Sequence, residues 1–156
     1  MRLRKRIRSE RGAELIEFGL TLPLLLLVVL GIIEFGFMFQ EYEVVTNAAR
    51  EGARLGSLIP SAGYTRAEAE ARVRDYLNAG GLVAARATPA PTVITSQAAI
   101  TGTTKCIQVV TSTVSYQHPV PFVSGIMSYF GSTQGTITLR GFSVMRTEGG
   151  STACPP

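Results

Sequence analysis

The sequence has no tryptophan, one histidine (His118) and two cysteines (Cys106 and Cys154). Two cysteines are too few for a structural zinc site. A catalytic histidine needs an aligned nucleophile or water and an orienting group, and nothing near His118 in the sequence suggests one. Glycine-rich phosphate loops and clusters of His, Cys and Asp ligands are also missing. We therefore expect no enzyme activity, no metal and no cofactor, and we expect His118 to lie in a loop.

Basic residues are scarce beyond the first twelve positions. Residues 1–12 hold six of the fifteen basic side chains and one of the eleven acids, which leaves nine basic and ten acidic residues in the rest of the chain. No basic stripe remains to neutralise phosphates, which argues against a nucleic-acid partner. A basic cluster just before an apolar run is instead a topology signal, because positive flanks stay on the cytoplasmic side of a membrane.

The apolar run extends from Phe18 to Ile33, sixteen residues without a charge. A membrane span needs about 20 apolar residues. Beyond Glu34, the segment 35–39 (Phe-Gly-Phe-Met-Phe) extends the apolar surface to that length, and its three phenylalanines could pack near the outer headgroups. We expect a single pass through the cytoplasmic membrane, with the N-terminus inside and the C-terminal region exported.

Three interpretations of this segment compete. A cleavable secretory signal has small residues at a cleavage site after its apolar stretch, whereas this run is followed by bulky residues. A permanent signal anchor that carries a periplasmic or cell-surface binding domain explains the charges and the length. It leaves Gly12 and Glu17 unexplained, and the third interpretation uses both residues.

Gly12 is followed by four residues (Ala13 to Ile16) and then by Glu17 and Phe18. This spacing resembles the processing site of type IV prepilins, in the version of the Tad/Flp branch. The resemblance implies that a membrane aspartyl peptidase cuts after Gly12 on the cytoplasmic face and that the apolar segment is kept. Glycine resists helix formation and has no side-chain bulk, which suits an extended, accessible backbone at the cut.

Glu17 lies where the hydrocarbon begins. A carboxylate there costs about 2.5–3.5 kcal/mol on insertion scales, so it needs a partner. Cleavage would create a new amine on Ala13 and make Glu17 the fifth residue of the mature chain. In pilin assembly the expected partner of Glu17 is the N-terminal amine of a neighbouring subunit. An unpartnered carboxylate at headgroup level is the plainer alternative.

Residues 11–56 resemble the TadE-like pilin family, the minor pseudopilins of Tad systems. The likeness rests on the basic leader, the glycine cut site, the Leu-Pro-Leu-rich span, the Ile-Glu-Phe-Gly at its end and the following Asn-Ala-Ala-Arg-Glu-Gly-Ala-Arg. It implies a component of a thin surface pilus used in adhesion. The implied partners are a prepilin peptidase, other Tad pilins and pseudopilins, and the assembly platform of the inner membrane. Once assembled, the protein would lie outside the cell.

Pro23 lies inside the span, where it removes the hydrogen bond to the Gly19 carbonyl. Thr21 and neighbouring helices can partly compensate. Pro23 is either a weak point that lets the segment straighten on leaving the bilayer, or a tolerated membrane proline.

After the span, residues 42–58 keep a helical pattern. One face is small and apolar, and it fits either the core of the domain or an assembly surface; we favour the core. This face comprises Tyr42, Val45, Ala49, Gly52, Ala53 and Gly56. Pro60 and Gly63 are expected to end the helix. Thr65 and Glu68 form the sequence pattern of a capping box. The pattern opens a second helix, which ends at Gly80-Gly81 and whose apolar face comprises Ala67, Ala69, Ala71, Val73 and Leu77.

The remaining sequence predicts strands, because it is rich in Val, Ile and Thr with partial alternation. We expect strands at 92–100, 106–116 and 136–146, and a short apolar helix from Phe122 to Phe130 whose residues Phe122, Ile126 and Phe130 pad the sheet. The predicted fold class is α+β and pilin-like, with a transmembrane stem helix, a second helix and a small, mainly antiparallel sheet. Its parts are a leader (1–12), the stem (13–58) and an exported domain (59–156).

Cys106 and Cys154 are an even pair in a region that we expect to be exported. An oxidising compartment favours one disulfide between them, which would tie the tail 149–156 to a strand edge. Free thiols or bonds to partners remain the alternatives.

Overall fold

The computed structural model describes residues 10–121, 124, 125, 128, 131, 135–147 and 152–154. Its helices are α1 (Glu10–Ser57), α2 (Ile59–Ala62), α3 (Arg66–Ala79) and the 3-10 helix η1 (Ala84–Arg86). Its strands are β1 (Thr92–Ala99), β2 (Lys105–Pro119), β3 (Thr136–Arg146) and β4 (Thr152–Ala153). The predicted α+β class is confirmed.

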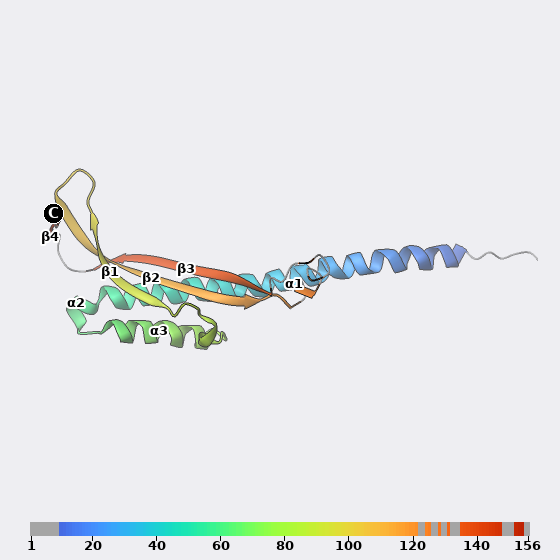
Figure 1. The fold of residues 1–156 in the computed structure, drawn as a ribbon, viewed down its shortest axis with the longest axis horizontal. Helices are drawn as coiled ribbons and strands as arrows, with labels where there is room; N and C mark the ends of the chain where they lie inside the picture. The colour runs from blue at the N-terminus through green and yellow to red at the C-terminus, as the bar shows by residue number, and fades with distance from the viewer. Residues whose placement is uncertain are drawn as a thin grey trace, which may run out of the picture.

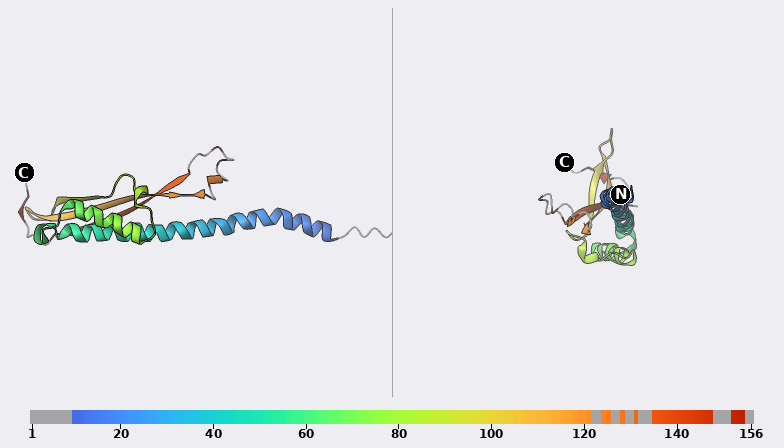
Figure 2. Two further views of the ribbon diagram at one scale, coloured as in Figure 1. Left: turned by 90° about the horizontal axis from the view of Figure 1, so that it is seen from below. Right: turned by 90° about the vertical axis from the view of Figure 1, so that its right-hand side faces the viewer.

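The molecule is elongated because α1 is far longer than the other elements (Figure 1). The second half of α1 packs on α3 and on the sheet, whereas its first half extends away from both. The end-on view in Figure 2 shows α1 and α3 together beside the strands. One continuous helix therefore serves both as a projecting rod and as a core element of the folded part.

The sheet is antiparallel, with β2 in its centre between β1 and β3. β4 pairs with the first residues of β2, opposite Lys105 and Cys106, and so continues the edge that β3 occupies further along. β3 has the predicted bounds. β2 is longer than predicted at both ends, and β1 ends one residue earlier.

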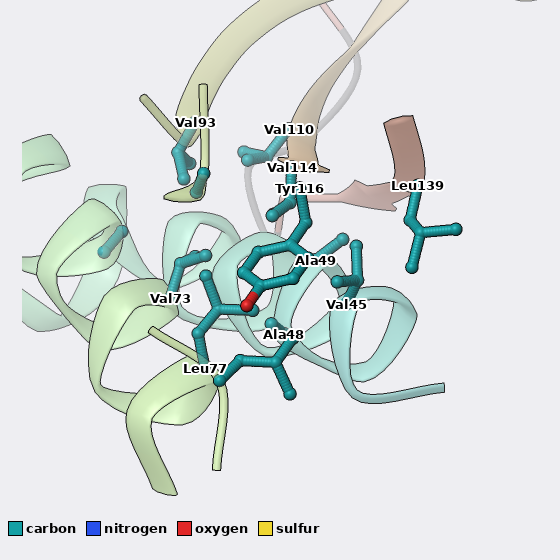
Figure 3. Close-up of a cluster of buried hydrophobic side chains, with 13 residues drawn as sticks. Val45, Ala48, Ala49, Val73, Leu77, Val93, Val110, Val114, Tyr116 and Leu139 are labelled. Atoms are coloured by element: carbon teal, nitrogen blue, oxygen red, sulfur yellow. The ribbon is translucent and has the colours of Figure 1, made fainter. Parts of the chain in front are cut away.

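The core lies between the small-residue face of α1, the inner side of α3 and the inward face of the sheet (Figure 3). Tyr116 is its largest fully buried side chain. Val110, Val114 and Tyr116 lie on one face of β2, and all three are buried. The favoured core interpretation of the helix face is confirmed for Val45, Ala49 and Ala53, each with no exposed surface.

Two glycines on α1 allow the sheet to approach closely. A Cβ built at Gly52 would lie 2.6 Å from Oγ of Ser112, and one at Gly56 would lie 2.6 Å from Cγ1 of Val110. Both distances are well below ordinary contact, so these positions have no room for a side chain. The Gly-x3-Gly spacing thus brings the α1 backbone against β2.

α3 begins as predicted. The Thr65 side chain accepts a hydrogen bond from the backbone of Glu68, and the Glu68 carboxylate accepts one from the backbone of Thr65 at 2.7 Å. The hydrogen bonds from the Thr65 backbone and then its hydroxyl lower the pKa of Glu68. This reciprocal capping fixes the first turn of α3.

An ion-pair cluster joins α3 to the solvent side of α1. Glu51 accepts hydrogen bonds from Arg54 at 2.9 and 3.0 Å and from Arg72 of α3 at 3.3 Å. The hydrogen bonds from Arg54 lower the pKa of Glu51 most, burial opposes them, and Arg72 adds to the lowering. Each such exposed pair contributes less than about 1 kcal/mol to stability.

Some helix predictions were wrong in detail. Tyr42 is 45% exposed rather than core, and Ala67 and Ala71 lie on the exposed side of α3. Pro60 does not end α1, which stops at Ser57; it lies inside the separate turn α2, and Gly63 ends that turn with a left-handed φ of 73°. Proline fits there because the first helical turn needs no donor at that position.

The predicted disulfide is present between Cys106 and Cys154, 48 residues apart in sequence. The backbone N–H of Cys154 also donates to the carbonyl of Thr104 at 3.1 Å. Closing a loop of this size contributes roughly 4 kcal/mol in the chain-entropy model. The bond and β4 together fasten the C-terminal tail to the start of β2. The predicted padding residues Phe122, Ile126 and Phe130 lie outside the described residues.

Gly141 on β3 tests how closely the sheet must approach α1. A Cβ at this position would lie 2.5 Å from the backbone oxygen of Val45, and backbone cannot move aside as a side chain can. We expect Gly141→Ala to destabilise the folded part by about 1–3 kcal/mol. This loss of stability should appear as faster hydrogen exchange of the β2 and β3 amides, measured on the full chain in detergent. Gly135→Ala is the matched control, since no atom lies within 4 Å of its Cβ. Equal protection in both variants would contradict the close approach.

Candidate functional site

The first half of α1 carries the largest exposed apolar surface among the described residues. Leucine, isoleucine, valine and phenylalanine side chains are exposed all around it, with Leu20 at 74%. α1 is long and apolar enough to cross a membrane, and the most apolar part of it is not buried by any described residue. A surface of this kind on a water-soluble protein is an interaction site. It suggests a single-pass membrane anchor.

The folded part contacts α1 nearer to the N-terminus of the helix than the sequence indicated. A cavity of about 150 Å³ lies between α1 and the ends of β2 and β3, lined by Gly31, Glu34, Phe35, Met38, Val120 and Ile137. Glu34 is buried there. The freely projecting helix therefore runs from Gly12 to about Leu30, which is about 27 Å long at 1.5 Å per residue. That length nearly matches a hydrocarbon core of about 30 Å, and the extension of the span by segment 35–39 stays a prediction.

The predicted processing residues lie in the first turns of α1. Gly12 and Ala13 are helical, because α1 begins at Glu10, so the expectation of extended backbone at Gly12 is wrong for this state of the chain. Terminal turns open at little cost, and glycine lowers that cost further. Ala13, Glu17 and Phe18 are exposed. Glu17 lies one turn beyond Ala13 on the same side of the helix.

α1 runs unbroken through Pro23. The Thr21 hydroxyl donates to the carbonyls of Glu17 at 3.0 Å and Phe18 at 3.2 Å. Figure 2 shows that α1 bends gently in this N-terminal region, as a helix does where a proline interrupts its hydrogen bonds. Beside the proline, a shallow apolar groove is lined by Phe18, Thr21, Leu22, Leu24, Leu25 and Val28.

His118 is not in a loop, contrary to our expectation. It lies on β2, is 5% exposed, and its Nδ1 is 2.7 Å from Oε2 of Glu41 on α1. Since a carboxylate only accepts, the imidazole donates from Nδ1. The Nε2 atom has no hydrogen-bond partner among the described residues. β2 extends past Tyr116 far enough to bring His118 onto the helix, and no signal in the sequence indicates this extension.

Next to this pair is a cavity of about 380 Å³ at the membrane-proximal end of the folded part. Glu34, Phe37, Gln40 and Glu41 line it from α1, Gly80, Gly81 and Leu82 from the end of α3, and His118, Pro119 and Pro121 from the end of β2. Within the described part of the chain, no group of three His, Cys, Asp or Glu side chains could hold a metal ion. The pair joins elements far apart in sequence, α1 and the end of β2.

These features define an α+β protein whose long apolar helix suggests a membrane anchor and continues into the core of the folded part. Comparison with known proteins gives a family for the helix: residues 12–54 match the sequence model of the family described as TadE-like protein. This confirms the resemblance read from residues 11–56 and is consistent with a TadE-like pseudopilin of the Tad pilus system. The match begins at Gly12 and ends within α1, so α3 and the sheet lie outside it. No curated protein and no solved structure matched the chain.

The Glu41–His118 contact should stabilise the junction of α1 and β2. Glu41→Ala would leave the imidazole buried without its hydrogen-bond partner, at a cost of about 1–3 kcal/mol. We expect faster hydrogen exchange at the β2 end around His118 in the full chain in detergent. Glu43→Ala removes an exposed carboxylate two residues away and should change exchange little. Equal exchange in the two variants would show that the contact contributes no stability.

Proposed function

We propose that this protein is a minor pseudopilin of a Tad-type pilus, cut by a prepilin peptidase and acting in pilus assembly and surface adhesion. The observation that supports this most directly is the TadE-like match on α1, which begins at Gly12. The exposed apolar half of α1 adds to it, because an assembling pilin must exchange a lipid contact for contacts with other helices. We propose that the N-terminus lies in the cytoplasm, since six basic residues precede the span.

The peptidase would act on the bond between Gly12 and Ala13 after the first turn of α1 opens. Both residues are at the start of the helix, where few hydrogen bonds must break. Glu17 and Phe18 lie one turn further on and would mark the membrane boundary for the enzyme.

Glu17 would then dock subunits. Its carboxylate is exposed, and apolar side chains surround it on the following turns. The amine of Ala13 on a neighbouring copy reaches it when that copy is shifted along the axis by four residues, or about 6 Å. A charge-assisted pair of this kind offsets the cost of a carboxylate in hydrocarbon. Pro23 would allow the helix to straighten as the pair forms.

The other proposed partners are further Tad pilins and the inner-membrane assembly platform. Neither a nucleic acid nor a catalysed reaction enters this function. The alternative is an uncut, signal-anchored binding domain. The intact mass of the protein from the membrane fraction separates the two: loss of residues 1–12 supports the pseudopilin, and a full-length mature protein supports the anchor.

Processing can be tested at Gly12. Gly12→Leu should insert normally, because the basic flank is intact, but should remain uncut, because the larger side chain blocks the scissile bond and strengthens the first helical turn. Leader removal is measured by intact mass and by mobility on a gel. Gly19→Leu is the control, as Gly19 is an exposed helical glycine with no atom near its Cβ. Normal trimming of Gly12→Leu would eliminate Gly12 as the processing residue.

Docking can be tested at Glu17. Glu17→Val should insert at least as well as the wild type, since it removes a costly charge, and should still lose its leader. Incorporation into filaments should fail, because the neighbouring amine loses its counter-charge. Leader removal, membrane level and surface filaments are measured separately in a pilus-forming host that lacks the native copy. Glu14→Val serves as the matched control and should assemble. Wild-type filament numbers for Glu17→Val would refute the docking role, and loss of cleavage alone would assign Glu17 to peptidase recognition.

A further inference from the structure

The sheet has an outer face that no described element covers. α1 and α3 both pack on the opposite, inner face. The register places Ile94, Thr111 and Val144 in one row across the outer face, and Thr92, Thr113 and Phe142 in the next. Phe142 is 64% exposed, and Ile94 and Val144 are also exposed. Two adjacent rows of a sheet thus present apolar side chains away from the core.

The outer face also has charge of one sign. β1, β2, β3 and β4 contain no Asp or Glu. Their basic residues are Lys105, Arg140 and Arg146, and alternation along the strands places all three on the outer face. The outer face therefore fits a partner surface that is apolar and acidic.

α1 has a surface of that kind. From Gly12 to Ala49 the helix carries five acidic residues and no Lys or Arg, and of these acids Glu43 is the exposed one beside the folded part, since Glu34 is buried and Glu41 contacts His118. Phe35, Phe39, Tyr42 and Glu43 recur at helical spacing along one side, which we call the stem stripe. All four are exposed, Phe39 at 53%. Phe39 and Glu43 lie on the side of α1 away from Val45 and Ala48, which pack into the core, whereas Phe35 and Tyr42 lie at the edge of the packed face.

Lipid cannot cover the upper part of the stem stripe. Tyr42 follows Glu41, which contacts His118, and precedes Val45, whose backbone meets Gly141. At this level the helix already runs beside the folded part and above the free span that ends near Leu30. An exposed tyrosine and glutamate at this level are open to water and to a protein partner rather than to hydrocarbon.

We propose that the outer face of the sheet binds the stem stripe of a second copy of this chain. Tyr42 of the second copy lies on Phe142, its Phe39 lies along the apolar part of the Arg140 side chain, and its Glu43 pairs with the Arg140 guanidinium. The charges support this choice of occupant, because one surface lacks acids and the other lacks bases, and the two lie on different sides of the same molecule. Such a contact is heterologous, so each copy at the end of an array keeps one free surface, and an axial offset between copies prevents the array from closing into a ring.

The proposed axial offset of copies agrees with this contact. Gly141 lies beside Val45. Arg140 is one residue nearer the projecting helix on β3, so it lies at about the level of Glu43 in the same copy. A shift of the second copy by about 6 Å, one helical turn, raises its Glu43 to about the level of Phe142. An extended arginine spans that distance from Arg140. The same shift brings the amine of Ala13 to Glu17, so this inference deepens the proposed function by adding a contact between exported domains.

A photo-reactive phenylalanine at position 142 tests the contact in cell membranes. Two copies with different tags are co-expressed, and only one carries the probe. We expect cross-linked dimers that contain both tags, with the linked peptide lying in the stem stripe of the unprobed copy. The position control carries the same probe at position 83, just before η1, where Val83 is exposed. This control should give no such dimer.

Charge reversal tests the pairing. Arg140→Glu in the probed copy should lower the dimer yield about tenfold, as the loss of about 1.4 kcal/mol of binding would. Glu43→Arg in the other copy should restore the yield. Arg74→Glu on the exposed side of α3 is the matched control and should leave it unchanged. Protection of Cys106 and Cys154 from alkylation without reductant shows that each variant has formed the disulfide of the exported part.

The outcomes separate this contact from the proposed function. A processed protein that gives no cross-link from position 142, or gives one to a different protein, overturns the contact with a second copy and leaves the proposed function standing. An uncut protein whose probe still links to the stem stripe, with rescue by the double reversal, supports the contact and overturns the proposed function. Equal dimer yields for Arg140→Glu and Arg74→Glu overturn the pairing of Arg140 with Glu43.

Discussion

The close contact between the second half of α1 and the sheet is the constraint on which the rest of the structure depends. Gly52 and Gly56 on the helix and Gly141 on β3 remove the side chains that would otherwise separate the two layers. A long helix in water would have little stability of its own. Packed in this way, the helix acquires a fixed direction, and the apolar rod that projects from the folded part is held in line with the strands.

That contact also decides where the membrane part ends. Because the ends of β2 and β3 reach down to Gly31, the helix below is only about as long as a bilayer core is thick. The buried Glu34 and the Glu41–His118 pair occupy the boundary between the two parts. The polar residues of this junction thus lie inside protein, where they are partly shielded from both lipid and water.

Much of the fold could be predicted from the sequence because its signals are local. The capping box of Thr65 and Glu68, the alternation in β2 and the small-residue face of α1 each depend on residues near in sequence. The long apolar helix could be predicted from composition. Its resemblance to the TadE-like family could be recognised because several motifs lie close together in residues 11–56. The position of His118 could not be predicted, because it depends on how far β2 runs beyond Tyr116 before it meets α1. The exposure of Tyr42 likewise depends on the angle between α1 and the sheet. So does the position near Gly31 at which the folded part first contacts α1.

The direction of the strands has a mechanical consequence. β2 and β3 run lengthwise along α1 (Figure 1), so tension along the molecule would load their ladder in shear, with many hydrogen bonds resisting together rather than one after another. The disulfide fixes the far end of β2 to the C-terminal tail, which prevents that end from peeling. A filament built from such subunits would carry load through covalent bonds and laterally paired strands, and would yield at contacts between subunits before the subunits themselves extend.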